Sequence, residues 1–428
     1  MKNTLCALVF VFAGIYLQTV NAIPDGPLPD AVLDRNIKTV QFYREGWEFA
    51  YPILEMNASK PLILSFDDIS PSPKLYNYTV LLCDADWMPS RLSFSEYAEG
   101  FNQNTLSDYQ PSFSTHIPYT HYSLSIPNSN LQLKLSGNYV LLVYETDEDK
   151  PIFIKRFTLL DKAVDIIPNV HRATLPVFQN TSQEVDFRIL NPNYAIDDPF
   201  QTIKVVIVKN NQWKLSISGL KPLFIRDKEL EYNFEETNLF LGGNEYRSFD
   251  TKSLKYQEEN VQSIGFNGQY WVVKLRPDKP RDRKGYMYQQ ELNGKYLIQN
   301  QQGNNPNIDA EYLHVQFSFP MDAPLIDGDI YVWGGFTDFN CYDDTKMTYN
   351  LEAKKYELDM MVKQGYYNYQ YVYVAKNSTD IDERYFEGSY YETENNYVIY
   401  VYHRPFGCRY DKLIGVKIAN SLKNTISF

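Results

Sequence analysis

Short segments with the composition of β-strands recur along the whole chain and are separated by turns rich in Pro, Asp, Ser and Asn. In the first third of the chain they lie at residues 38–43, 62–66, 78–83, 139–144 and 153–159. Their β-branched and aromatic side chains favour a pleated, half-buried surface, and almost no helical periodicity interrupts them. Short strands with dense turns are typical of antiparallel sandwiches. The sequence therefore predicts an all-β protein made of tandem β-sandwich domains.

The composition agrees with this fold class. The 428 residues include 36 Tyr and 25 Phe but only 20 Gly and 8 Met, and 44% of them are hydrophobic. Disordered chains carry far fewer aromatic residues, so this chain should fold. At roughly 100 to 200 residues per domain, its length suggests two to four domains. The net charge of −12 disfavours a general nucleic-acid binder, because phosphate contacts need clustered cations.

Two further sets of strands predict where the domains begin and end. The second set lies at residues 185–190, 203–208, 213–218, 232–234 and 270–275. The third set lies at residues 312–319, 328–333, 347–349, 356–361, 366–374, 394–402 and 412–418. Residues 276–284, rich in charge and proline, and the amide-rich residues 299–308 are typical of linkers or loops. We therefore expect sandwich domains at 36–161, 162–285 and 311–428, an N-terminal lead at 23–35, and a linker or crossing segment at 286–310.

One short helix is expected within the first domain. Ser93 and Glu96 have the spacing of a capping box, and Gly100 is well placed to end the helix. We place this helix on an excursion between two strands.

The N-terminus has the features of a secretory signal peptide. Lys2 precedes an apolar run at residues 5–16, and Val20-Asn21-Ala22 supplies the small residues of a cleavage site. The run is shorter than the roughly 20 residues that span a bilayer, which disfavours an uncleaved anchor. Residues 1–22, including Cys6, are therefore expected to be removed on export.

The expected mature chain keeps three cysteines, Cys83, Cys341 and Cys408. An odd number cannot pair completely within one chain, so buried thiols that act as small hydrophobic residues are favoured. The alternative is a Cys341–Cys408 bridge, because an exported protein meets oxidising conditions.

Motifs of the common enzyme classes are absent from the sequence. It contains no HExxH, no G-x-S-x-G, no G-x-x-x-x-G-K-[ST] and no G-x-G-x-x-G after a strand. The acid pairs Asp67-Asp68 and Asp84-Ala85-Asp86 could serve a glycosidase, but paired acids at loop ends are common. His116 and His121 are expected on opposite faces of a strand, which disfavours a shared metal. We therefore predict a protein that is not an enzyme, with no catalytic residue, no cofactor and no metal site.

Alternating tyrosines between Tyr366 and Tyr373 allow two interpretations. They could form a cross-strand ladder or a platform on which a sugar stacks. Cross-strand aromatic pairing explains them without any ligand and is the favoured interpretation.

The last predicted domain resembles a known fold family. Residues 330–339, 347–349 and 365–372 are similar to early-set immunoglobulin-like modules related to glycogen-binding domains. This resemblance implies an immunoglobulin-like fold for that domain.

The order of short motifs along the chain resembles the plug proteins of the Bacteroidetes type IX secretion system. The motifs are IKTVQF (37–42), LSFDD (64–68), CDADW (83–87), SGNYVL (136–141), RSFDTKSL (247–254), GYYNYQY (365–371), YHRPFG (402–407), RYD (409–411) and LIG (413–415). Each motif alone is weak evidence for the family, but the order of all of them along the chain is specific to it. Residues 289–308 match the family least.

The resemblance implies a periplasmic protein on the inner side of the outer membrane. Such a protein would bind the periplasmic mouth of the very large translocon barrel, SprA or Sov, and close its pore between cargo transits. It would need no nucleic acid, no small-molecule substrate and no direct membrane insertion. The alternative is an exported carbohydrate-binding or glycan-processing protein, suggested by the glycogen-binding likeness and the tyrosine-rich strand.

One loop is the candidate for contact with the barrel. It carries Arg404, Phe406, Arg409 and Tyr410, and Arg and Tyr are frequent anchors of protein interfaces. The same mixture of charged and aromatic residues could equally form a buried corner.

Overall fold

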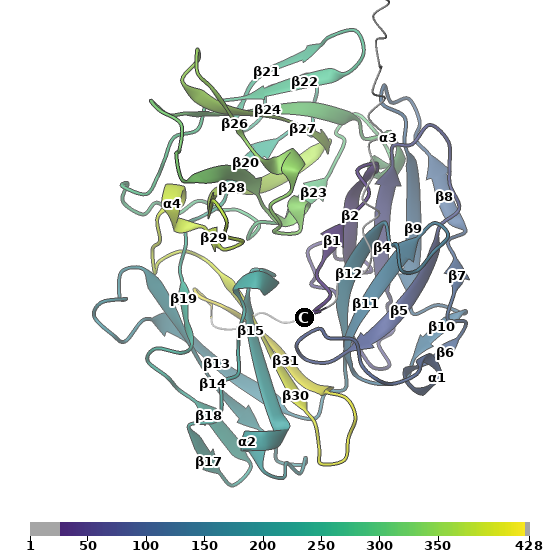
Figure 1. The fold of residues 1–428 in the computed structure, drawn as a ribbon, viewed down its shortest axis with the longest axis vertical. Coiled ribbons are helices and arrows are strands. Elements are labelled where there is room, and N and C mark those ends of the chain that lie inside the picture. The colour runs from purple at the N-terminus through teal and green to yellow at the C-terminus, as the bar shows by residue number, and fades with distance from the viewer. Residues whose placement is uncertain (1–25, 424–428) are drawn as a thin grey trace, which may run out of the picture.

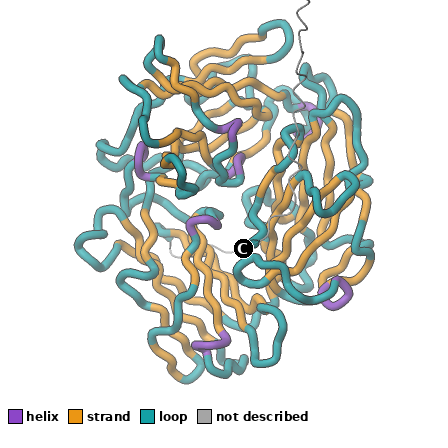
Figure 2. Tube along the Cα trace, viewed as in Figure 1, coloured by secondary structure: helices purple, strands orange, loops and turns teal. Residues whose placement is uncertain are grey.

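The structure, a computed structural model, describes residues 26–423, so the predicted signal peptide lies outside the described residues. Strands dominate and the helices are single turns (Figure 2). The strands build three sandwiches, of which the N-terminal one lies beside the other two (Figure 1). The all-β prediction is confirmed. Between residues 26 and 423, no helix is long and apolar enough to cross a bilayer.

The N-terminal sandwich packs a six-stranded sheet, ordered β1-β12-β11-β5-β7 with β3 on β12, against a four-stranded sheet ordered β2-β4-β9-β8. Its strands are β1 (Ala31–Val32), β2 (Ile37–Arg44), β3 (Ile53–Glu55), β4 (Leu62–Asp68), β5 (Asn77–Cys83), β7 (Asn104–Thr105), β8 (Asp108–Pro111), β9 (Thr120–Ile126), β11 (Gly137–Tyr144) and β12 (Phe153–Leu160). Phe66 and Tyr122 stack on one another in the core, and Phe153 meets Phe66 from the opposite sheet. Every residue of β11 and β12 is buried, because the outer face of their sheet is also covered.

The predicted helix is present but shorter than expected. α1 (Phe94–Tyr97) begins with the capping box of Ser93 and Glu96. It leads directly into β6 (Ala98–Gly100), which pairs with β10 (Leu131–Leu133), so Gly100 ends a strand and not the helix.

The middle sandwich is built from two parts of the chain that are far apart in sequence. One sheet is ordered β13-β14-β18-β17 with β19 on β14, and the other is ordered β16-β15-β30-β31. The strands are β13 (Asp165–Arg172), β14 (Ser182–Leu190), β15 (Ile203–Lys209), β16 (Ile217–Ser218), β17 (Phe224–Arg226), β18 (Glu229–Tyr232), β19 (Leu239–Leu241), β30 (Asn396–His403) and β31 (Lys412–Asn420). α2 (Pro199–Thr202) precedes β15, and the 3-10 helix η1 (Trp213–Leu215) replaces the first half of the strand expected at 213–218.

The third sandwich is inserted between β19 and β30. One of its sheets is ordered β20-β28-β23 with β25 and β29 also on β28, and the other is ordered β21-β22-β24-β27-β26. The elements are β20 (Arg247–Asp250), β21 (Val261–Phe266), β22 (Trp271–Leu275), β23 (Tyr296–Ile298), α3 (Pro306–Asp309), β24 (Tyr312–Pro320), β25 (Gly328–Trp333), η2 (Gly335–Thr337), η3 (Asp343–Thr345), β26 (Thr348–Asn350), β27 (Lys355–Lys363), β28 (Gly365–Ala375), β29 (Ile381–Asp382) and α4 (Arg384–Glu387).

This strand pairing differs from the expected boundaries 162–285, 286–310 and 311–428. β20, β21 and β22 pair within the third sandwich, although their residues lie within 162–285, the range expected for the middle one. β30 and β31 were expected in the last domain but pair with β15 of the middle one. The physical reason is that the alternation of side chains along a strand shows which of its faces is apolar but does not identify its neighbour. Any other strand can satisfy its backbone hydrogen bonds.

The three described cysteines are unpaired, but only one of them fits the favoured interpretation of a buried thiol. Among the described residues, Cys83, Cys341 and Cys408 are all free thiols, and Cys83 is buried. Cys341 belongs to the third sandwich and Cys408 to the β30–β31 loop, so the alternative Cys341–Cys408 bridge is not formed.

Candidate partner-binding surface

The loop between β30 and β31 is fastened to the N-terminal sandwich by ion pairs and hydrogen bonds around the buried Asp411. Arg404 Nε lies 2.8 Å from Asp411 Oδ1, and Arg404 Nη2 lies 2.5 Å from Asp84 Oδ1. Asp411 Oδ2 accepts hydrogen bonds from Ala85 N at 2.8 Å and from Lys204 Nζ at 2.9 Å. Arg404 and Asp411 therefore clamp the loop onto the residues that follow β5.

Two more of the predicted contact residues also bind within the chain. Arg409 forms an ion pair with Glu96 of α1. Tyr410 packs against the core of the N-terminal sandwich. The structure therefore brings the four predicted residues into one loop, but it uses three of them to hold that loop in place.

Phe406 faces outward, with 73% of its surface exposed. Arg409 is also exposed, but it is held by its ion pair with Glu96. Arg404 N donates to Thr202 O at 2.9 Å, which brings the loop beside α2 and its exposed Phe200. Lys221 Nζ donates to Phe200 O at 2.6 Å, so the segment leading into β17 adjoins the same helix. These elements lie together at the lower end of the molecule in Figure 1.

We name this region the apolar end surface. It consists of five exposed hydrophobic residues, Phe200, Leu223, Phe224, Ile225 and Phe406. Exposed hydrophobic residues on adjoining elements mark interaction sites in many soluble proteins, because exposed apolar area is costly in water. Sequence reasoning missed residues 223–225, since three adjacent apolar residues usually indicate a buried strand.

The edge position of β17 explains why those residues stay exposed. β17 is the last strand in the order β13-β14-β18-β17, so β18 covers only one of its sides. A free edge presents unpaired backbone groups to which a partner strand can add. The apolar end surface therefore combines exposed rings with an available strand edge.

The tyrosines of β28 are a ladder in the core of the third sandwich. Tyr367, Tyr369 and Tyr371 are buried. Tyr369 Oη and Tyr371 Oη donate to Asp278 Oδ2 at 2.6 and 2.9 Å. Buried rings cannot stack on a sugar, so this strand provides no glycan platform.

The acid pair considered for catalysis has a structural role. Asp67 accepts from Lys363 Nζ and from Tyr312 Oη, both at 2.7 Å, and lies 2.7 Å from His121 Nδ1. Burial alone would raise the pKa of the Asp67 carboxyl, but Lys363 and His121 outweigh burial and hold the pKa below its ordinary value. Because Tyr312 and Lys363 belong to the third sandwich, Asp67 joins two sandwiches in its ionised form.

A cavity of about 120 Å³ lies where the three sandwiches meet. Arg156 lies over the rings of Trp87 and Trp213, 4.4 and 5.6 Å from their centroids, and its Nε donates to Leu28 O at 2.6 Å. Lys155 beside it forms an ion pair with Asp338 of the third sandwich. The charges around this cavity thus fasten the three sandwiches to one another.

Comparison with known proteins identifies the family. Residues 37–161 match the family model described as the first domain of the type 9 secretion system plug protein. The crystal structure of a hypothetical protein from Parabacteroides merdae shares 35% identity and a TM-score of 0.88, over 92% of this chain and 99% of that chain. The chain belongs to the type IX secretion system plug family. No curated protein matches it.

Membership defines the general role. Plug-family proteins are components of the type IX secretion machinery. The matched residues 37–161 correspond to the N-terminal sandwich, to which the β30–β31 loop is clamped.

Proposed function

We propose that this plug-family protein binds the periplasmic mouth of the large outer-membrane translocon barrel, SprA or Sov, and closes its pore between cargo transits. The proposal is carried by the match of residues 37–161 to the plug family's first domain. Its place of action would be the periplasm, against the inner side of the outer membrane. A wide water-filled barrel leaks small molecules unless a rigid body covers its opening.

The contacts between sandwiches supply such a body. Lys363 with Asp67 joins the third sandwich to the N-terminal one, and Arg404 with Asp84 joins the middle one to it. An apolar cluster that includes Leu160 of β12 and Val416 of β31 fills the junction between the N-terminal and middle sandwiches. A lid fastened in this way can resist the entry of solutes without bending.

We further propose that the apolar end surface contacts the barrel, with Phe406 as its most exposed ring. Arg404, Arg409 and Tyr410 would act indirectly, since they position the loop that presents Phe406. Large aromatic side chains presented by rigid loops are typical interface anchors.

The test is an affinity pull-down of the tagged mature chain from detergent-solubilised envelopes, with mass spectrometry of the copurified proteins. We expect a very large barrel in near-stoichiometric amount. Phe406→Asp should reduce its recovery by about ten-fold or more, because a charge would be buried in the contact. Ile326→Asp is the matched control, since Ile326 is 86% exposed in the third sandwich.

The outcomes separate the two parts of the proposal. Failure of the unmodified chain to retain a large barrel would contradict the plug function. Recovery that is equal for Phe406→Asp and Ile326→Asp would leave the function standing and refute the contact surface.

A further inference from the structure

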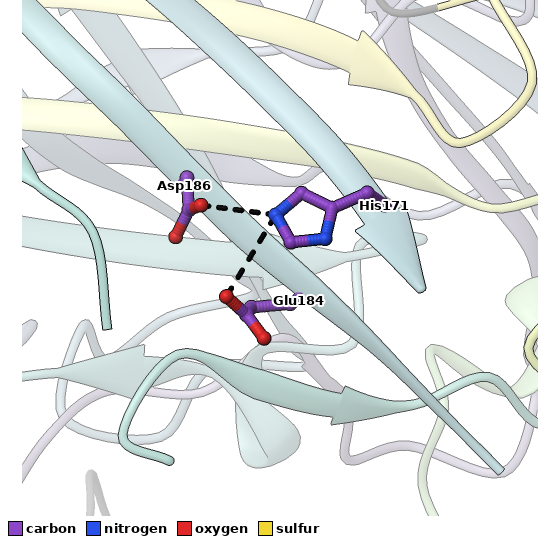
Figure 3. A group of neighbouring side chains, drawn as sticks. All are labelled: His171, Glu184 and Asp186. Carbon is purple, nitrogen blue, oxygen red and sulfur yellow. Dashed lines mark hydrogen bonds and ion pairs between the residues drawn. The ribbon is translucent and has the colours of Figure 1, made fainter. Parts of the chain in front are cut away.

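Three ligand-type side chains meet on one face of the middle sandwich. His171 on β13 lies directly opposite Glu184 on β14, and Asp186 lies two residues further along β14 on the same face. His171 Nε2 is 3.0 Å from Asp186 Oδ2 and 3.7 Å from Glu184 Oε1 (Figure 3). One ligand atom from each residue lies within 4.8 Å of the others.

The hydrogen bond of His171 Nδ1 determines whether Nε2 of the neutral ring carries a hydrogen or a lone pair. His171 Nδ1 lies 2.8 Å from Arg172 O, and a carbonyl oxygen only accepts, so Nδ1 carries a hydrogen. In the neutral ring, Nε2 then points a lone pair at two carboxylate oxygens. That arrangement requires a positive charge at Nε2, either a proton or a metal ion.

Both carboxylates are oriented by further hydrogen bonds. Glu184 Oε2 accepts from Thr174 N at 2.8 Å, and Asp186 Oδ1 accepts from Asn238 Nδ2 at 2.8 Å. Asn238 is fully buried. Outer partners that fix the ligand oxygens in this way are characteristic of metal sites.

The charge balance favours a divalent ion over a proton. The Glu184 side chain is 1% exposed and that of Asp186 is 10% exposed, and a protonated His171 would leave one of their two negative charges uncompensated. Two carboxylates that are almost completely buried attract a metal cation to this position.

We propose that His171, Glu184 and Asp186 bind a divalent ion of the zinc type. One imidazole nitrogen and two carboxylate oxygens suit Zn²⁺, and bonds of about 2.0 to 2.2 Å in a tetrahedron separate ligand atoms by roughly 3.4 Å. The two distances from Nε2, 3.0 and 3.7 Å, lie on either side of that value. The His171 side chain is 34% exposed, so water can supply the fourth ligand.

The site would tie an edge strand to its neighbour. β13 is the first strand in the order β13-β14-β18-β17, and β14 is its one partner in that sheet. A metal ion bridging the two strands would stabilise this hairpin independently of any contact with a barrel.

The test is calorimetric titration of ZnCl₂ into the chelator-treated mature chain, purified without a histidine tag. We expect one ion per chain with micromolar or tighter affinity. His171→Gln should weaken binding by about 100-fold or abolish it, because it removes the nitrogen ligand. His314→Gln is the matched control, since His314 Nδ1 lies 2.6 Å from one carboxylate, that of Asp359, and should keep full binding.

A second measurement needs only the unmodified chain. Bound Co²⁺ should give the intense visible absorption of a tetrahedral site with nitrogen and oxygen ligands. The spectrum of hydrated Co²⁺, the absence of stoichiometric zinc binding, or equal binding by His171→Gln would each overturn the proposal and leave an ordinary His171 ion pair.

Discussion

At the scale of single residues, ion pairs formed by buried side chains stabilise the folded state. Glu387 is fully buried and accepts from Arg247 Nε at 2.9 Å, from Arg281 Nε at 2.7 Å and from Tyr371 N at 3.1 Å. Burial alone would raise the pKa of the Glu387 carboxyl, but the two arginines outweigh burial and lower it to about 2. Glu387 therefore stabilises the third sandwich only while it is ionised.

This stabilisation predicts a pH dependence. A carboxyl whose pKa falls on folding stabilises the folded state above its ordinary pKa of 4.5, and the effect is lost as the pH falls toward 2. The shift corresponds to about 3 kcal/mol. We expect Glu387→Gln to lower the free energy of unfolding by about 3 to 5 kcal/mol at pH 7, because it removes the charged partner of Arg281 and leaves the buried Arg247 with Asp278 alone.

The measurement is urea unfolding of both proteins between pH 7 and pH 3. The difference between them should shrink below pH 4.5, and a difference that does not change with pH would contradict the prediction. Glu236→Gln, on an exposed side chain, is the control and should change stability by less than about 0.5 kcal/mol at either pH.

At the scale of elements, the return of β30 and β31 completes the middle sandwich. β15 pairs with β30 in a register that places Val208 opposite Val398, and β31 then places Ile418 opposite Val398. The core between the two sheets includes Phe187 of β14 and Ile399 of β30. The insertion of the third sandwich is therefore compatible with a continuous core beneath it.

An engineered disulfide tests this pairing. Val208→Cys with Val398→Cys should form a disulfide in high yield, because directly opposite residues of an antiparallel pair lie about 4.5 to 5.5 Å apart. Peptide mapping by mass spectrometry distinguishes this bond from any involving Cys83, Cys341 or Cys408. Val208→Cys with Ile418→Cys is the control and should stay reduced, since two strand spacings of about 4.8 Å exceed the roughly 7 Å limit. Cross-linking of the control pair would show that the register is wrong.

At the scale of the whole molecule, the sandwiches are joined by side chains that none of them could bury alone. Lys363 of β27 is buried against Asp67 of β4, with Nζ 2.7 Å from Oδ2. Each side chain would carry an unsolvated charge if its partner were removed. The arrangement of the sandwiches is thus coupled to the stability of each one.

Asp67→Asn should therefore destabilise the whole chain. We expect a loss of about 3 to 5 kcal/mol in urea unfolding, because Lys363 would be left buried without its counter-charge. Small-angle scattering should show an increased radius of gyration before the sandwiches unfold. Asp329→Asn is the control, since the Lys346–Asp329 pair has the same 2.7 Å distance but is partly exposed, and it should cost less than about 1 kcal/mol. Equal losses in the two variants would contradict a role for Asp67 in joining the sandwiches.

The positions of strands were largely predictable, because they depend on local composition and on turn residues. The expected strand at 62–66 corresponds to β4, that at 328–333 to β25, and that at 366–374 to β28. The capping box of α1 was also predictable, since both of its residues lie within one turn. The short strands β20 and β23 were not predicted, because three or four residues carry too little pattern of their own.

The candidate surface was only half predictable. The sequence singled out the loop with Arg404, Phe406, Arg409 and Tyr410, but charge and aromaticity do not show which of these residues face solvent. Arg404 forms ion pairs with Asp84 and Asp411, which lie far apart along the chain, while the Phe406 side chain is exposed to solvent. The contribution of residues 223–225 depends on β17 being at a sheet edge, which is a property of the assembled sheet.

By itself, the sequence determined the all-β class, the approximate strands and the family, because each rests on side chains read in order along the chain. The tertiary structure alone decided which strands pair, that residues 396–420 return to the middle sandwich, and which charges are buried together. The physical reason is that backbone hydrogen bonds are the same for every strand, so partners are chosen by the packing of distant apolar faces and by the need to pair each buried charge.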